Sequence, residues 1–195
     1  VRLRLTPRHA VQRVVEVIDV QDLPRRFEGR IAAGFRYGDF QFATDLDSDA
    51  LLHRGVFSCY GPTTLTPPPS DARKQLSPDN WKELLYLAHV DRARAFRMYS
   101  EYYLGTTGQV YWSDEHQMST YIDDYHNTLG DRLGHFRHGG EMITEIYVPR
   151  DALVRFLGDV RADFRASRAE LIYGTVRLIE RDTETVLAWA TQPYA

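Results

Sequence analysis

A chain of 195 residues is long enough to bury one sizeable core, and 43% hydrophobic with 26% charged residues is typical of globular proteins, not of disordered or fibrous ones. The net charge of −3 is spread over both signs, so no basic stripe favours nucleic acid, and no apolar run predicts a membrane span or a signal peptide. The single Cys59 excludes an internal disulfide and a thiolate-rich zinc site. We therefore expect a single cytoplasmic domain spanning 1–195.

The first half of the sequence combines β-rich runs with one helical signal. Apolar and polar residues alternate in the first two runs, Asp22-Leu23-Pro24 starts a helix that Gly34 ends, and a proline-rich stretch follows the last run. The predicted elements are, in order, strands over 1–6 and 11–19, a helix before Gly34, an antiparallel pair over 35–42 and 55–60, and an exposed connection over 61–76.

The second half begins with a strong helix signal. Ser77-Pro78-Asp79 offers a cap, a proline at the first helical position and an acid near the positive helix end. The predicted elements are a helix over 78–103, an aromatic segment over 110–125, a glycine-rich loop over 134–140, a strand over 142–148, a helix over 153–164, and strands over 171–179 and 186–190 joined by a turn at 182–184.

This order of elements predicts an α+β fold. The connections are long enough for helices to cross over an antiparallel sheet, and we expect the helices on one face of it. The sequence starts and stops within predicted strands, so we expect adjoining parts of the polypeptide to be missing.

Six segments in order carry a family resemblance, and together they span nearly the whole chain. They are 37–42, 54–60, 108–114, 121–126, 141–150 and 172–180. These segments resemble bacterial FAD-binding oxidoreductases related to vanillyl-alcohol oxidase, alditol oxidase and delta-24 sterol reductase. The resemblance implies the ferredoxin-like cap domain of such an enzyme, whose open sheet face covers the flavin and holds the substrate.

In that family a separate N-terminal domain binds FAD through a glycine-rich loop. No G-x-G-x-x-G motif occurs in this sequence, so the resemblance implies that the FAD-binding domain is absent from the chain and that the isolated chain holds no flavin. The parent would transfer hydride from a small-molecule substrate to FAD. The missing domain is then the expected partner, and apolar surface exposed by its loss is expected to favour a homodimer.

Two strand positions are the first candidates for substrate binding. Alternation along 142–148 puts Glu145 and Tyr147 on one face, and a Glu-x-Arg on the corresponding strand of alditol oxidase-like proteins holds substrate hydroxyls. Arg177 would either pair with Glu145 across the sheet or anchor a polar substrate. The competing interpretation is that Glu145 faces water on a one-sided sheet.

The aromatic segment supplies a second group of candidates. Flat rings and amide groups suit a sugar or another polyol, although aromatic side chains also serve as core. The expected pocket residues are Trp112, Gln117 and Tyr121, with Tyr111 and Tyr125 beside them.

Other chemistries have less support. Of the histidines 116, 126, 135 and 138, His135 and His138 lie three apart in a glycine-flanked loop without a nearby acidic ligand, so we expect no metal site. Cys59 lies in an apolar run typical of a buried thiol. The alternatives to a cap domain are a free-standing α+β ligand-binding or interaction module without catalytic activity, and a cofactor-free ferredoxin-like oxygenase.

Overall fold

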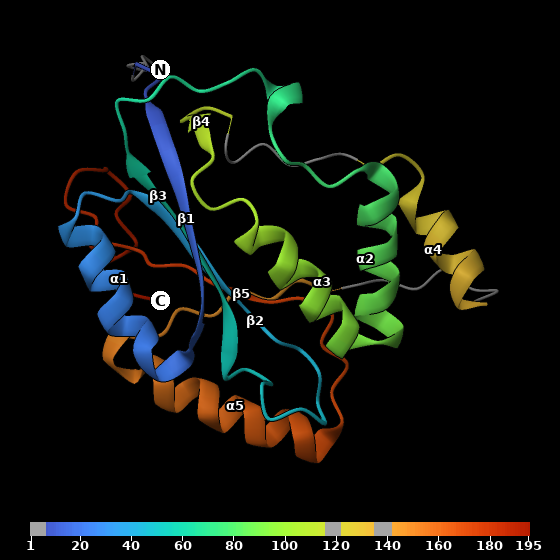
Figure 1. Cartoon of the computed structure of the whole chain (residues 1–195). Coiled ribbons are helices and arrows are strands. Elements are labelled where there is room, and N and C mark those ends of the chain that lie inside the picture. Colours follow the sequence, from blue (N-terminus) through green and yellow to red (C-terminus); the bar gives the residue numbers. More distant parts are fainter. Residues whose placement is uncertain (1–6, 116–121, 135–141) are drawn as a thin grey trace.

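A computed structural model describes residues 7–115, 122–134 and 142–195 of the chain (Figure 1). In this part of the chain a five-stranded antiparallel sheet is combined with five α-helices, which confirms the predicted α+β class. The predicted strand over 1–6 and most of the glycine-rich loop lie outside the described residues.

The strands follow the order β4-β1-β3-β2-β5 across the sheet. Their bounds are β1 Ala10–Asp19, β2 Tyr37–Phe42, β3 Arg54–Pro62, β4 Val110–Trp112 and β5 Thr175–Val176. The α-helices are α1 Leu23–Ala32, α2 Pro78–Val90, α3 Arg92–Leu104, α4 Tyr125–Leu133 and α5 Leu153–Ser167. Single 3₁₀ turns occupy Val20–Asp22, Ser70–Ala72 and Arg150–Ala152.

The pairing of β1 with β3 forms the centre of the sheet. It runs from Val11 opposite Pro62 to Asp19 opposite Arg54. β1 is rich in β-branched residues, which pack well on a pleated surface, and its side chains point alternately to the two faces. β3 continues two residues beyond its predicted end, into the stretch expected to be a connection.

Helices α1 and α5 cover one face of the sheet. Phe27 of α1 meets Phe57 of β3 edge to face, with ring centroids 4.8 Å apart, and Phe40 and Leu157 belong to the same buried cluster. The expectation that the helices lie on one face of the sheet is wrong. A second layer, formed by α2 and α3, packs on the opposite face over Val15 and Val56, so that the sheet lies between helices in Figure 1.

The span predicted as one long helix contains two. Asp91 leaves the helical region, with φ −149° and ψ 77°, and its N–H closes α2 on the carbonyl of Leu87. Its carboxylate then accepts a hydrogen bond from the Arg94 N–H and caps α3. One residue therefore ends one helix and starts the next.

The predicted strands of the C-terminal third are largely wrong. Only Thr175–Val176 of the span 171–179 is a strand, and neither 142–148 nor 186–190 forms one. The β-rich composition is present, but Ile143 is 92% and Val186 99% exposed, and no backbone hydrogen bond between described residues involves 142–147. Strand propensity takes effect only where a neighbouring edge supplies hydrogen bonds and packing.

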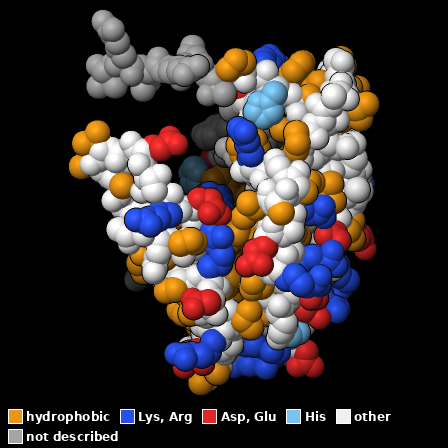
Figure 2. Space-filling model, turned by 90° about the vertical axis from the view of Figure 1, so that its left-hand side faces the viewer, with side chains coloured by type: hydrophobic (Ala, Val, Ile, Leu, Met, Phe, Trp, Pro, Cys, Tyr) orange, Lys and Arg blue, Asp and Glu red, His pale blue; other side chains and the backbone are white. Residues whose placement is uncertain are grey.

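The surface is mixed in charge. In Figure 2, Lys and Arg are spread over the visible face together with Asp and Glu, with hydrophobic side chains between them. Among the helices that the structure describes, none is long and apolar enough to cross a membrane.

Replacing Phe57 by alanine should lower the free energy of unfolding by about 3–5 kcal/mol, because it empties the contact between the sheet and α1. Urea denaturation would measure the change. Val90→Ala, at a side chain that is 51% exposed, is the matched control and should change stability by less than about 0.5 kcal/mol. Equal effects of the two substitutions would contradict this account of the core.

Candidate functional site

Polar side chains gather on the face of the sheet that carries α2 and α3. The register places Arg13 of β1 opposite Tyr60 of β3, and Ser58 of β3 opposite Asp39 of β2. Because side chains alternate along each strand, these residues point to the same face. We call Arg13, Asp39, Ser58, Tyr60, Thr175 and Arg177 the polar face.

Arg13 is a buried cation surrounded by aromatic rings. Its exposure is 7%, its Nε donates to the hydroxyl of Tyr60 at 2.8 Å, and its Nη1 donates to Thr106 at 3.1 Å. The guanidinium carbon lies 4.9–5.1 Å from the ring centroids of Tyr60, Tyr103 and Tyr111. Burial lowers the pKa of Arg13, but the neighbouring tyrosines outweigh it and the pKa is raised, so the group stays charged.

The tyrosines around Arg13 remain neutral hydroxyl groups. Burial raises the pKa of Tyr60 to about 12, although the charge of Arg13 opposes the change. Burial also raises the pKa values of Tyr99 and Tyr103 on α3. At neutral pH these side chains are therefore hydrogen-bond donors and acceptors without charge.

Asp39 is the acidic group of the polar face. Its side chain is partly buried, and the hydroxyl of Thr175 donates to its Oδ2 at 3.2 Å. Burial raises the pKa of Asp39, while the Thr175 hydrogen bond and the charges of Arg177 and Arg13 act in the opposite direction. A carboxyl group that takes up a proton more readily than usual, beside hydroxyl groups and cations, is typical of a binding or proton-transfer site.

Glu145 and Tyr147 lie in an exposed segment away from any strand. The Tyr147 hydroxyl donates to Glu145 Oε2 at 3.0 Å, and this bond raises the pKa of Tyr147. The Tyr147 ring contacts Trp189, with centroids 4.5 Å apart. Without a strand over 142–148, the predicted alternation of its side chains between two faces is wrong.

Arg177 does not pair with Glu145. Between these two described residues the structure has no hydrogen bond or ion pair, so the expected cross-sheet pair is wrong. The charge of Arg177 instead opposes the burial that raises the pKa values of Asp39 and Tyr173. Of the predicted substrate-binding residues, Arg177 alone among those described belongs to the polar face.

The predicted aromatic pocket is divided by the sheet. Tyr111 contacts Arg13 on the polar face, whereas its strand neighbour Trp112 lies under the guanidinium of Arg8 at 4.2 Å. Tyr125 begins α4 and is 38% exposed. Gln117 and Tyr121 lie outside the described residues, and their assignment to a substrate pocket stays a prediction.

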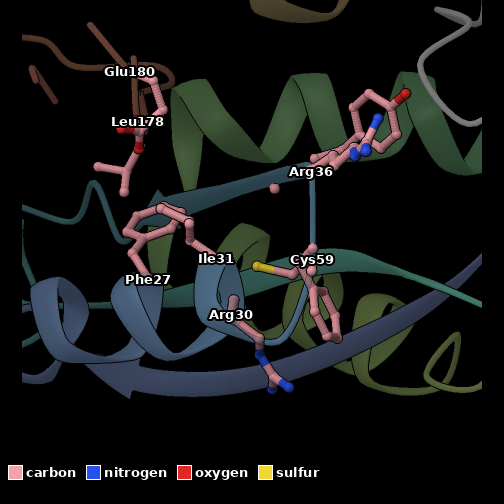
Figure 3. Close-up of a pocket in the computed structure, with 11 residues that line it drawn as sticks. Phe27, Arg30, Ile31, Arg36, Cys59, Leu178 and Glu180 are labelled. Atoms are coloured by element: carbon pink, nitrogen blue, oxygen red, sulfur yellow. The ribbon is translucent and has the colours of Figure 1, made fainter.

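Two half-open cavities flank the segment 34–37, at the start of β2. The one beside α1 has a volume of about 390 Å³. Figure 3 shows the Cys59 sulfur pointing toward the side where Phe27 and Ile31 lie, with Leu178 and Glu180 farther across the space. Burial raises the pKa of Cys59 to about 12, so the thiol stays protonated, in agreement with the prediction of a buried, non-nucleophilic cysteine.

Within the described ranges, no group of three His, Cys, Asp or Glu side chains is arranged to hold a metal ion. His126 belongs to α4, whereas His116, His135 and His138 lie outside these ranges.

Sequence reasoning missed the two central groups, Arg13 and Asp39. A signal existed for Arg13, because it occupies an inward position between Val11 and Val15 on a strand that alternates. A charged residue at such a position indicates either a buried network or a functional group.

Comparison with known proteins adds no relative. No protein-family model, no curated protein and no solved structure matches the chain. The geometry of the polar face is therefore the observation on which a functional proposal rests.

Asp39→Asn should stabilise the protein near neutral pH. The folded-state pKa of Asp39 is raised, so ionisation reduces stability as the pH rises through the ordinary value of about 4 and upward to the folded-state pKa. The substitution removes that loss. The free energy of unfolding, measured in urea, should be higher for the variant near neutral pH, and the difference should shrink as the pH falls below about 4.

Asp47→Asn is the control with the opposite sign. The hydrogen bond from Arg168 lowers the pKa of this exposed carboxylate, so its stabilising effect is present above the ordinary pKa and is lost as the pH falls. A loss of stability in both variants near neutral pH would refute the assigned state of Asp39.

Proposed function

We propose that the chain is the substrate-binding cap domain of an FAD-dependent oxidoreductase that transfers hydride from its substrate to flavin. The observation that carries the proposal is the polar face, where Thr175 of β5 is hydrogen-bonded to Asp39 of β2 and the charge of Arg177 acts on Asp39, beside buried tyrosines. It agrees with the resemblance of the six sequence segments. FAD, when bound, supplies the hydride acceptor, and the protein supplies position and electrostatics.

The polar face is accessible at one end of the sheet. Helices α2 and α3 pack over Val15 of β1 and Val56 of β3. At the β5 end, Tyr173 is 56% exposed and Arg177 is also exposed. In the proposal, a small molecule approaches Asp39 from the side of β5, while Arg13 stays enclosed.

The described helix ends do not fit the pyrophosphate of FAD. Phosphates bind helix N-termini because the free N–H groups point at them, and acidic side chains there repel them. Acidic residues cap or lie in the first turn of four of the described α-helices, at Asp22, Asp79, Asp91 and Asp124, and Asp151 lies in the 3₁₀ turn before α5. In the proposal, the cofactor's phosphates therefore lie against another domain of the same polypeptide.

Exposed apolar side chains offer a surface for that domain. Met142 and Ile143 are 89% and 92% exposed, and Val186 and Leu187 are 99% and 88% exposed. Large apolar side chains at such exposure are typical of surfaces that a partner covers. The FAD-binding domain is the proposed partner, and a second copy of the chain takes its place in a homodimer of the isolated chain.

The side chains of the cap have distinct roles in this proposal. Asp39 accepts a hydrogen bond from a substrate hydroxyl, and Arg177 binds a polar or anionic group. The exposed Glu145 and Tyr147 are joined by their hydrogen bond and contact the substrate from the adjoining segment. Trp112, Gln117 and Tyr121 remain proposed substrate contacts from the sequence resemblance.

The complete open reading frame that contains this chain provides the test. Its purified product should carry one FAD per polypeptide, and the flavin absorbance should bleach when a reducing substrate is added without oxygen. The 195-residue chain alone, mixed with FAD, should show no flavin retention after gel filtration. A complete reading frame whose product holds no flavin would favour the free-standing binding module instead.

A further inference from the structure

The cavity beside α1 lies on the opposite face of the sheet from the polar face. Gly38 of β2 and Cys59 of β3 line it, and Cys59 belongs to the buried cluster under α1 and α5. Their chain neighbours Asp39 and Ser58 point to the other face, because side chains alternate along a strand. The volume of about 390 Å³ is within the range of roughly 300–1,000 Å³ that small-molecule pockets have.

The apolar stripe of α1 runs into this cavity. Leu23, Phe27 and Ile31 are spaced four residues apart, so they lie along one side of the helix. Leu23 is 0% and Phe27 4% exposed, whereas Ile31 is 41% exposed. The close packing of the stripe therefore ends at Phe27. Ile31 lines the open space together with Phe35 and Leu178, and these side chains offer an apolar wall to a ligand.

Of the charged side chains that line the cavity, Arg36 alone has no partner among the described residues. Arg30 is paired with Glu16 at 2.8 Å, and Glu180 is paired with Arg150 at 2.9 Å. Arg36 makes no hydrogen bond or ion pair with any residue in the part of the chain that the structure describes. The cavity thus combines an apolar wall with one available positive charge.

We propose that this cavity binds an amphipathic monocarboxylate, which is a small molecule with an apolar tail and one carboxylate group. The tail lies against Ile31, Phe35 and Leu178, and the guanidinium of Arg36 donates hydrogen bonds to the carboxylate. In the view of Figure 3, Arg36 and Leu178 lie on opposite sides of the space, so the two ends of the ligand have separate contacts. The site requires no flavin and is independent of the proposed oxidoreductase.

Arg36 also lines the second cavity, which has a different character. Its volume is about 440 Å³, and the side chains of His9, Tyr37 and Tyr60 bring polar groups to its lining. The stripe of α1 does not reach it, because Ile31 lines the first cavity alone. An apolar tail therefore favours the cavity beside α1.

Titration of the 195-residue chain with octanoate, followed by ¹H–¹⁵N NMR, tests the site near neutral pH. The backbone amide signals of Gly34, Gly38 and Cys59, which line the cavity, should shift along one saturable curve. The signals of Val186 and Leu187, which are apolar and exposed elsewhere, should not shift. Shifts confined to Val186 and Leu187, or no shift at all, would overturn the proposal.

Two comparators separate the contribution of the charge from that of the tail. Octan-1-ol has the same tail without the charge and should bind about fivefold more weakly, because a hydrogen bond to a charged group is lost. Octyltrimethylammonium carries the opposite charge and should bind more weakly than octan-1-ol. If octanoate and octan-1-ol bind equally well, Arg36 does not hold the carboxylate and the assignment is wrong.

Substitutions locate the two ends of the ligand. Arg36→Gln should remove the preference for octanoate over octan-1-ol, whereas Arg155→Gln, at an arginine of α5 whose side chain is 89% exposed, should leave that preference unchanged. Ile31→Trp fills the space beside α1 and should weaken both compounds about tenfold, the effect of burying roughly two methylene groups fewer.

Circular dichroism confirms that each variant is folded before its affinity is compared. Identical behaviour of the two arginine variants refutes the role of Arg36. Unchanged affinities in Ile31→Trp place the ligand outside this cavity and refute the site.

Discussion

The antiparallel pairing of β1 with β3 is the constraint on which the rest of the structure depends. It fixes which residues of each strand point to α1 and α5 and which point to α2 and α3. A shift by one residue would exchange the faces and bring Phe57 among the tyrosines and Tyr60 into the apolar cluster. The register therefore separates an apolar side, which stabilises the domain, from a polar side.

Burying the polar side chains of this face costs solvation free energy, and their contacts offset that cost to different degrees. The buried charge of Arg13 is stabilised by hydrogen bonds to two hydroxyl groups and by three aromatic ring faces. Asp39 has one side-chain hydrogen bond, and the Ser58 hydroxyl has no hydrogen-bond partner among the described residues. Buried polar groups that lack full compensation reduce stability, and proteins keep them where binding or chemistry needs them. This contrast, on one sheet face, distinguishes the well-compensated surroundings of Arg13 from the less compensated groups Asp39 and Ser58.

The sequence sufficed for elements whose pattern is local. Ser77-Pro78 gave the start of α2, and the alternation around Val15 gave β1, because caps and strand periodicity act through near neighbours. The division at Asp91 was missed since an acidic residue within a helical pattern does not by itself indicate a break. At the site, Arg177 was identified but its neighbour Asp39 was not, because their proximity depends on the pairing of strands far apart in sequence.

The unpaired C-terminal segments have a consequence for the behaviour of the domain on its own. Residues 142–148 and 186–190 are β-prone, and most of their apolar side chains face water, next to the short edge strand β5. Glu145 interrupts the first segment and Glu184 precedes the second, and such charged gatekeeper residues oppose stacking of like chains. Loss of these two charges by substitution would remove that protection, and the edge would become a template for open-ended cross-β assembly instead of a closed pair.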